Sequence, residues 1–245
     1  MRLLFVHQNF PGQYRHLAAH YASLPGHEVG AIGEKDHLCP QPRLRGVKLF
    51  AYEPGRAAAD GFEGSLLRAT QRGRALAAGA AALRRSGFRP DGVFAHIGWG
   101  EALFLKDVFP EAKLLLYCEF FYRLRGADTG FDPEFPPSPG SALRLRMMNA
   151  PPLMALDAAD WGVVPTRWQQ RQFPAAYKER ISVIHDGIDT DFVGPQENDS
   201  REELITYVAR NLEPYRGFHV FMRAIPEIQR RRPKARIVIV GGDEV

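Results

Sequence analysis

Cysteine is scarce in this sequence: its 245 residues include only Cys39 and Cys118. The two lie far apart, and neither has a CxxC neighbour or a histidine at metal-binding spacing, which argues against a disulfide framework and a structural zinc site. Long apolar runs are missing too, and no stretch approaches the roughly 20 residues that span a bilayer. The apolar run 3–6 ends at His7 without a cleavage-site pattern, so no signal peptide is expected. These absences favour a cytoplasmic protein.

Lysine is also rare and provides six of the 32 Lys and Arg residues, although the net charge is +4. The arginines are spread along the chain and lack the interleaved aromatics of a single-strand binder, so nucleic acid is not expected as a partner. The excess positive charge is compatible with weak attraction to acidic lipids at the inner face of the membrane. Hydrophobic residues make up 45% of the chain, enough for a packed core.

Apolar β-rich segments alternate with helical ones, which is typical of a parallel sheet with helices on both faces. The predicted strands before residue 193 are 2–7, 27–32, 47–52, 92–96, 113–118, 161–164 and 181–184. The predicted helices are 13–24, 64–85, 99–108, 141–159 and 167–173. Residues 123–140 contain several prolines and glycines without periodicity, so we expect a loop of a length that is usually functional or disordered.

A polar segment, residues 194–203, is predicted to link a first domain, residues 1–193, to a second region, residues 204–245. The second region contains a predicted strand, helix and strand at 204–209, 217–231 and 235–240. A lone βαβ unit leaves strand edges and one sheet face uncovered. We therefore expect it to be part of a larger, truncated domain.

Five motif-like segments follow one another along the chain: Asn9–Leu17, Asp91–His96, Ala159–Thr166, Ile181–Phe192 and Ala209–Phe218. The last three are similar to the patterns "aD.via.S", "v.vIpNGvDt..F" and "GRL.peKG". Together, and in this order, they resemble glycosyltransferase family 4, which has the GT-B fold of two Rossmann-like domains.

The resemblance implies an enzyme that moves a sugar from a nucleotide-sugar to a carbohydrate or lipid-linked acceptor. It implies retention of anomeric configuration and neither a cofactor nor a metal. Residues 1–193 would be the acceptor-side Rossmann-like domain, and 204–245 part of the nucleotide-sugar-binding domain. The chain as given is then expected to be incomplete and inactive.

Arg210 and Arg216 are the predicted ligands of the donor diphosphate. Arg210 ends a predicted strand and Arg216 precedes a helix, which places both at the carboxyl edge of a sheet, where α/β proteins bind ligands. Fixed cations there would stabilise the charge that grows on the leaving group. The family has Arg and Lys at these positions, so Arg216 replaces the Lys. The alternative is that both are surface residues near a turn.

Gly12 is a further predicted diphosphate contact, because it exposes backbone next to a helix N-terminus. The alternative is a Pro–Gly turn selected for its φ angles. The segment is not a GxGxxG motif, which argues against a dinucleotide enzyme. Asp189 is expected in the cleft between the domains, although a structural role in a turn is favoured there.

His96 and Glu119, each at the end of a buried strand, are the predicted catalytic residues. The resemblance places Glu119 where many family members carry a histidine that contacts the sugar. His96 fits equally well as a strand-end histidine bonded to the backbone. Trp99 and the aromatics at 120–122 either stack on a ligand or belong to the core.

Two other functions fit this sequence. A GT-B sugar-nucleotide epimerase shares the architecture and would differ in the motifs of its second domain. A non-catalytic acceptor-binding or scaffold module would retain residues 204–245 as a remnant.

Overall fold

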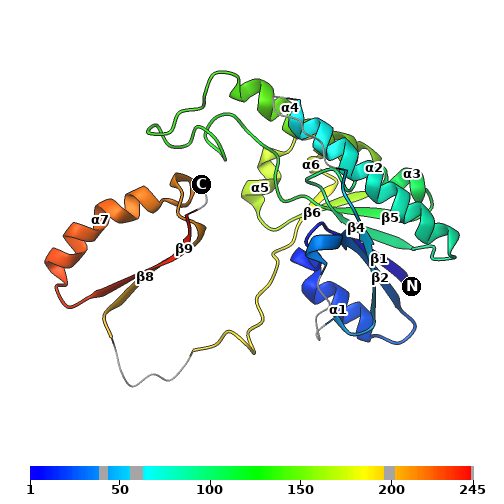
Figure 1. Ribbon diagram of the computed structural model, residues 1–245, viewed down its shortest axis with the longest axis horizontal. Helices are drawn as coiled ribbons and strands as arrows, with labels where there is room; N and C mark the ends of the chain where they lie inside the picture. The colour runs from blue at the N-terminus through cyan, green and yellow to red at the C-terminus, as the bar shows by residue number, and fades with distance from the viewer. Residues whose placement is uncertain (39–43, 56–62, 196–201, 244–245) are drawn as a thin grey trace. The chain divides into compact units, whose positions relative to one another are not determined.

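The structure, a computed structural model, describes residues 1–38, 44–55, 63–195 and 202–243 (Figure 1). The chain divides into two compact units: Met1–Phe131 with Pro137–Gly187, and Asp132–Pro136 with Ile188–Val245. The predicted domain limits at 193 and 204 stay predictions. Cys39 and most of the predicted linker, 196–201, lie outside the described residues.

Within the described residues, the first unit forms a parallel sheet of seven strands in the order β3-β2-β1-β4-β5-β6-β7. The strands are β1 (Arg2–Val6), β2 (Glu28–Glu34), β3 (Val47–Tyr52), β4 (Gly92–His96), β5 (Lys113–Tyr117), β6 (Trp161–Val164) and β7 (Ile181–Val183). The strand order reverses between β1 and β4, and open α/β sheets bind their ligands at such a switch point. The predicted doubly wound α/β fold is confirmed.

Helices cover this sheet on both faces. They are η1 (Gly12–Tyr14), α1 (Arg15–Ser23), η2 (Lys35–His37), α2 (Gly64–Arg85), α3 (Leu105–Val108), α4 (Ser141–Ala158), α5 (Arg167–Gln172) and α6 (Ala175–Lys178). Figure 1 shows α1 on one side of the sheet, with α2 and α4 running side by side on the other.

The alternation of side chains along β1 explains the two layers. Leu4 and Val6 belong to the larger core, which includes residues of α2 and α4. Leu3 and Phe5 belong to the smaller core, with residues of α1. All four are almost fully buried, and each such side chain contributes about 1.5–3 kcal/mol by leaving water. The strand is therefore held from both faces.

The predicted helix 99–108 is wrong over its first half, because only α3 (Leu105–Val108) is helical. Trp99 and Gly100 have φ values of 59° and 102°, outside the right-handed helical region. The reason is close packing against α2. A Cβ on Gly100 would lie 2.0 Å from the carbonyl oxygen of Ala69, and a Cβ on Gly73 would lie 2.6 Å from the carbonyl oxygen of Gly100.

The other helices, strands and loops agree more closely with those predicted from the sequence. The loop expected at 123–140 contains neither helix nor strand. The short helix α6 was not predicted; it follows Pro174, which stops the preceding helical pattern. Among the described residues, no helix has the length and apolar character needed to cross a membrane.

The second unit contains β8 (Leu204–Asn211), η4 (Pro214–Arg216), α7 (Phe218–Arg231) and β9 (Arg236–Gly242). β8 and β9 pair in parallel, which confirms the predicted βαβ unit. Every second side chain of β8 is half-buried, and Tyr207 packs its ring on Phe218 and Phe221. The aromatic contacts attach α7 to this pair of strands.

Candidate active site in the first unit

A pocket of about 310 Å³ is lined by residues from α2, from α4 and from the segments that follow β4 and β5. It therefore lies at the carboxyl edge of the sheet, beside the switch point between β1 and β4. The polar and aromatic side chains in its lining include His96, Trp99, Glu119, Arg68, Arg72 and Arg144.

His96 and Glu119 form a hydrogen-bonded pair in this pocket, with Nε2 of His96 2.9 Å from Oε2 of Glu119. The other ring nitrogen, Nδ1, accepts a hydrogen bond from the backbone N–H of Gly98 at 3.0 Å. Because Nδ1 acts as an acceptor, the proton of the neutral ring lies on Nε2 and is donated to Glu119. His96 is therefore bonded to the backbone, as one interpretation expected, and it also lines the pocket. Its catalytic role stays a prediction.

The hydrogen bond from His96 lowers the pKa of Glu119 below its usual value, although partial burial opposes this. The Glu119 side chain remains 28% exposed, and its backbone carbonyl accepts a hydrogen bond from the amide of Gln169. Glu119 thus presents an ionised carboxylate to the pocket at neutral pH, held by contacts on two sides.

His7 was not predicted as a site residue. It follows β1, and because Val6 is paired with Ala95, His7 lies opposite His96 at the edge of the sheet. Their rings are 5.2 Å apart, and Nδ1 of His7 accepts from the N–H of Asn9. Burial and the neighbouring His96 lower the pKa of His7 to about 4, so the ring is neutral. The sequence did not predict that the first and fourth strands pair; that pairing would have placed His7 beside His96.

Trp99 provides an aromatic surface at the same place. Its ring stacks on His96 with centroids 4.3 Å apart and planes 21° apart, yet 42% of the residue is exposed. A non-glycine residue with positive φ costs on the order of 1–3 kcal/mol, and such residues cluster at functional sites. The exposed ring suits the apolar face of a sugar better than a place in the core.

Gly12 has a clear structural role. Its φ is +46°, and a Cβ at this position would lie 2.6 Å from the ring of His7. The residue follows a cis Phe10–Pro11 peptide bond. Glycine is therefore needed here so that the turn can pack against His7, and the diphosphate contact stays a prediction.

The other predicted site residues belong to the second unit. Arg210 is an exposed residue near the end of β8, and Arg216 lies in η4 with its Nε 3.4 Å from Oε1 of Glu213. Asp189 accepts a hydrogen bond from the N–H of Phe192, as expected in a turn. The structure thus brings His96 and Glu119 together, with Gly12 held against the neighbouring His7. The donor-side roles of Arg210, Arg216 and Asp189 remain predictions.

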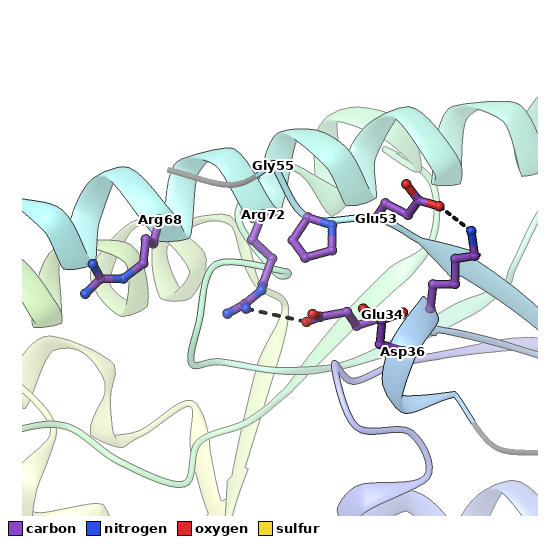
Figure 2. A pocket seen from close by; sticks show the side chains of 8 residues that line it. Glu34, Asp36, Glu53, Gly55, Arg68 and Arg72 are labelled. Atoms are coloured by element: carbon purple, nitrogen blue, oxygen red, sulfur yellow. Dashed lines mark hydrogen bonds and ion pairs between the residues drawn. The ribbon is translucent and has the colours of Figure 1, made fainter. Parts of the chain in front are cut away.

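A buried carboxylate, Glu101, lies beneath the arginine side of the pocket and was also missed. It is fully buried, accepts a hydrogen bond from Tyr52, and has Nε of Arg72 3.9 Å away. Arg72 also reaches Glu34 at 3.5 Å, as Figure 2 shows. Glutamate in a turn gives no sequence signal of burial, so only the packing identifies it.

The residues of Figure 2 line a neighbouring pocket of about 500 Å³ that shares Arg68 and Arg72 with the first. Its acidic side chains, Glu34, Asp36 and Glu53, stand near cations, and Lys35 pairs with Glu53 at 2.6 Å. Because Glu34 pairs with Arg72 and Lys35 with Glu53, this pocket is a weaker candidate for the active site.

Three ligand-type side chains of the second unit, Asp132, Glu134 and His219, place an atom each within 4.8 Å of one another. Glu134 is engaged by Arg223 through two hydrogen bonds, and His219 lies 3.0 Å from Asp132. Glu134 and Arg223 thus form an ion pair at this cluster, beside the contact between His219 and Asp132.

Comparison with known proteins identifies the family of this chain. Residues 25–193 match the family described as "Glycosyl transferase family 4 group". The chain belongs to this family. Among curated proteins, none has a significant sequence match.

Solved structures share the fold. The catalytic domain of starch synthase IV from Arabidopsis thaliana, bound to ADP and acarbose, superposes with a TM-score of 0.61 at 15% identity, over 100% of this chain and 69% of that chain. UDP-GlcNAc 2-epimerase from Neisseria meningitidis, bound to UDP-GlcNAc, gives 0.53 at 12%, over 98% and 65%. The calicheamicin glycosyltransferase gives 0.51 at 13%, over 98% and 65%.

These likenesses show the GT-B fold, and the family match over residues 25–193 shows the family. The chain spans between about 62% and 69% of the length of the first structures it matches.

Proposed function

We propose that this chain is part of a retaining glycosyltransferase that transfers a sugar from a nucleotide-sugar donor to an acceptor bound in the first unit. The observation that carries the proposal is the His96–Glu119 pair beside the exposed ring of Trp99, at the carboxyl edge of the sheet. Family membership supports the reaction class.

In this proposal Glu119 orients the attacking hydroxyl of the acceptor. An ionised carboxylate accepts a hydrogen bond from that hydroxyl, while His96 holds the carboxylate in place through Nε2. The acceptor oxygen forms a bond to the anomeric carbon, the bond from that carbon to the diphosphate breaks, and the hydroxyl proton is released with the nucleoside diphosphate. Trp99 would stack on the acceptor ring.

The second unit would hold the donor, with Arg210 and Arg216 at the diphosphate. Nucleotide ligands in two of the similar structures, ADP and UDP-GlcNAc, support this choice of donor class. No metal takes part in the proposed step, because arginine cations would neutralise the leaving diphosphate.

The test is release of nucleoside diphosphate from UDP-glucose, UDP-GlcNAc, ADP-glucose and GDP-mannose by the full-length protein, with and without candidate sugars as acceptors. We expect one donor to be consumed in an acceptor-dependent way, and Glu119→Gln to lower the acceptor-dependent rate about a hundredfold. Anomeric configuration of the product, read by NMR, tests retention.

Two other results would replace the proposal. Conversion of UDP-GlcNAc to its 2-epimer without an acceptor would identify an epimerase, which the shared architecture permits. Acceptor binding without consumption of any donor would identify a non-catalytic binding module.

A further inference from the structure

We propose that the acceptor is an aromatic alcohol, a small molecule whose hydroxyl is attached to an aromatic ring, rather than a free sugar. Its ring lies against Trp99 and Phe120, and its hydroxyl meets Glu119. This inference rests on the proposed function, because it names the class of acceptor for the same site. The transfer step is unchanged: the hydroxyl oxygen bonds to the anomeric carbon, the bond to the diphosphate breaks, and the hydroxyl proton is released with the nucleoside diphosphate.

Aromatic side chains come together in the pocket from the ends of two paired strands. Trp99 follows β4, and Phe120 and Tyr122 follow β5, which pairs with β4. The rings of Phe120 and Tyr122 are stacked, with centroids 5.9 Å apart and planes 9° apart. Aromatic rings favour stacked or edge-to-face contacts with one another, beyond the gain from the area that they bury. The pocket therefore offers a flat aromatic ligand more than one ring to contact.

Much of the remaining lining offers a ligand no side-chain hydrogen bond. These residues are Ala69 of α2, Ile97 after β4, and Met148, Pro151 and Pro152 of α4. A pyranose has hydroxyls around its whole rim, so some of them would face these side chains without a partner, which is unfavourable where water is partly excluded. The edge of an aromatic ring has no such groups. Trp99 alone would suit either kind of ring, and the residues around it favour the aromatic one.

The arginines of the pocket do not call for a polar or anionic ring. Arg72 lies 3.5 Å from Glu34 and 3.9 Å from the buried Glu101, so its charge is already paired. Arg68 also interacts with another group of the protein. The third, Arg144, is exposed in the first turn of α4. The charged side chain that faces the ligand most directly is therefore the carboxylate of the catalytic pair.

That carboxylate fixes where the acceptor hydroxyl lies. Glu119 is bonded to His96 through Oε2, so Oε1 is the oxygen that accepts a hydrogen bond from the acceptor. Hydrogen bonds to an ionised carboxylate are roughly twice as strong as those between neutral groups. A phenolic hydroxyl, with a pKa near 10, is a better donor in such a bond than an aliphatic hydroxyl. One hydroxyl on an aromatic ring thus satisfies the polar end of the pocket.

The segment that carries the aromatic residues is fixed by two amide side chains. Residues 119–122 belong to neither helix nor strand. The amide of Gln169 donates to the carbonyl of Glu119 at 3.0 Å. Asn149 accepts from the N–H of Tyr122 and donates to its carbonyl, both at 2.9 Å. A wall that is already ordered loses less freedom when a ligand binds, so it suits a rigid, flat ring.

The size of the pocket limits the ligand to a small ring system. A volume of about 310 Å³ is near the lower end of the range for small-molecule sites, roughly 300–1,000 Å³. It suits one or two fused rings rather than an oligosaccharide or a long lipid chain. 2-Naphthol is therefore the probe. Decahydro-2-naphthol has the same carbon skeleton without aromatic rings, and glucose is the polyhydroxylated alternative.

The first experiment measures binding of these three compounds to this chain by calorimetry, without donor. 2-Naphthol should bind at least about tenfold more tightly than glucose, because it buries apolar area. It should bind about threefold or more tightly than decahydro-2-naphthol, because of the aromatic contacts. 2-Methoxynaphthalene, which has no hydroxyl to donate, should bind about tenfold more weakly than 2-naphthol.

Two results of this experiment would overturn the proposal. Glucose bound as tightly as 2-naphthol would identify a polyhydroxylated acceptor. Decahydro-2-naphthol bound as tightly as 2-naphthol would identify an aliphatic alcohol, such as the end of a lipid, as the acceptor.

Variants then locate the binding site. Trp99→Leu should weaken binding of 2-naphthol about tenfold and binding of decahydro-2-naphthol much less, because leucine keeps an apolar surface but removes the ring. Leucine has a Cβ as tryptophan does, so the positive φ costs the variant no more than the parent. Phe120→Leu should show the same preference, which keeps the test open if one variant fails to fold.

Trp168 provides the matched control. It lies in α5, is 48% exposed, close to the 42% of Trp99, and is not among the residues that line the pocket. Trp168→Leu should bind 2-naphthol as the parent does. If Trp168→Leu weakens binding as much as Trp99→Leu, or if neither Trp99→Leu nor Phe120→Leu weakens it, the ring binds elsewhere and the site is wrong.

These binding measurements do not require turnover, so their outcome is separate from that of the transfer assay. Binding of 2-naphthol that depends on Trp99, in a full-length protein that consumes no donor, would refute the proposed function and leave the aromatic-alcohol site in place. Consumption of a donor with a sugar as acceptor, but not with 2-naphthol, would support the proposed function and overturn this inference.

Discussion

The hydroxyl of Tyr52 donates a hydrogen bond of 2.8 Å to Oε1 of Glu101, and both side chains are buried beneath the arginine side of the pocket. Burial raises the pKa of Glu101 to about 7, although the Tyr52 hydrogen bond and the nearby Arg72 partly offset the effect. Burial also raises the pKa of Tyr52 far above its usual value, which keeps the phenol protonated as a donor. The core therefore contains a carboxyl group, that of Glu101, which ionises only at a higher pH than an exposed glutamate.

The raised pKa predicts how stability changes with pH. In the unfolded chain Glu101 ionises near its ordinary value, so between that value and pH 7 the folded state binds more protons, and the free energy of unfolding falls as pH rises. The loss due to this group is about 3 kcal/mol. Glu101→Gln should remove this step, as urea unfolding at pH 5 and pH 8 would measure. The control is Glu28→Gln on the surface, which should keep it; an unchanged pH dependence in Glu101→Gln would contradict the assignment.

Gly12→Ala should destabilise the fold through two separate effects. Positive φ costs an L-residue about 1–2 kcal/mol, and the clash with the His7 ring adds on the order of 1–3 kcal/mol. Gly26 isolates the first effect, since its φ is +77° and nothing lies within 4 Å of a Cβ there. Urea unfolding should show a larger loss for Gly12→Ala than for Gly26→Ala. In a His7→Ala background the difference should shrink, and an undiminished difference would show that His7 is not the obstacle.

Glu119→Gln should lower the transfer rate of the full-length enzyme about a hundredfold, the contribution typical of a well-placed acid–base group. His96→Ala should act differently, through the pKa of Glu119. Without the hydrogen bond that lowers it, that pKa rises, so the acidic limb of the pH–rate profile should move to higher pH. His16→Ala, an exposed change on α1, is the control. A His96→Ala enzyme with an unmoved acidic limb would separate His96 from the function of Glu119.

Arg216→Ala in the full-length enzyme should reduce the rate more than it weakens acceptor binding. The charge on the leaving diphosphate grows toward the transition state, so loss of one charged donor costs about 3 kcal/mol, roughly a hundredfold in rate. Arg216→Lys should restore a good part of it, and Arg231→Ala at the far end of α7 should change little. Steady-state kinetics decide: a rate for Arg216→Ala within about twofold of the parent would show that Arg216, which lies beside Glu213, serves only as a surface ion pair.

The sequence predicted the fold well because buried parallel strands are strongly apolar, as in Leu114–Leu116 of β5. It failed at 99–104, where the apolar pattern fits a helix but Trp99 and Gly100 have positive φ and Gly100 packs closely against α2. The proximity of His96 and Glu119 could be predicted because the ends of parallel strands meet at one edge of the sheet. His7, Glu101 and the arginines of the pocket were missed, because their positions depend on which strands pair and which helices pack together.

The contact between Gly73 and Gly100 has a consequence for how acceptor choice can change. Main chain meets main chain there, and neither residue has a side chain that could be shortened to widen the space between α2 and the Trp99 turn. The opposite wall is made by α4, where the unbranched, adaptable side chain of Met148 lies next to Pro151 and Pro152. Divergence that widens or narrows the pocket, in nature or by directed evolution, would therefore proceed through α4, while the spacing between α2 and the Trp99 turn stays constant.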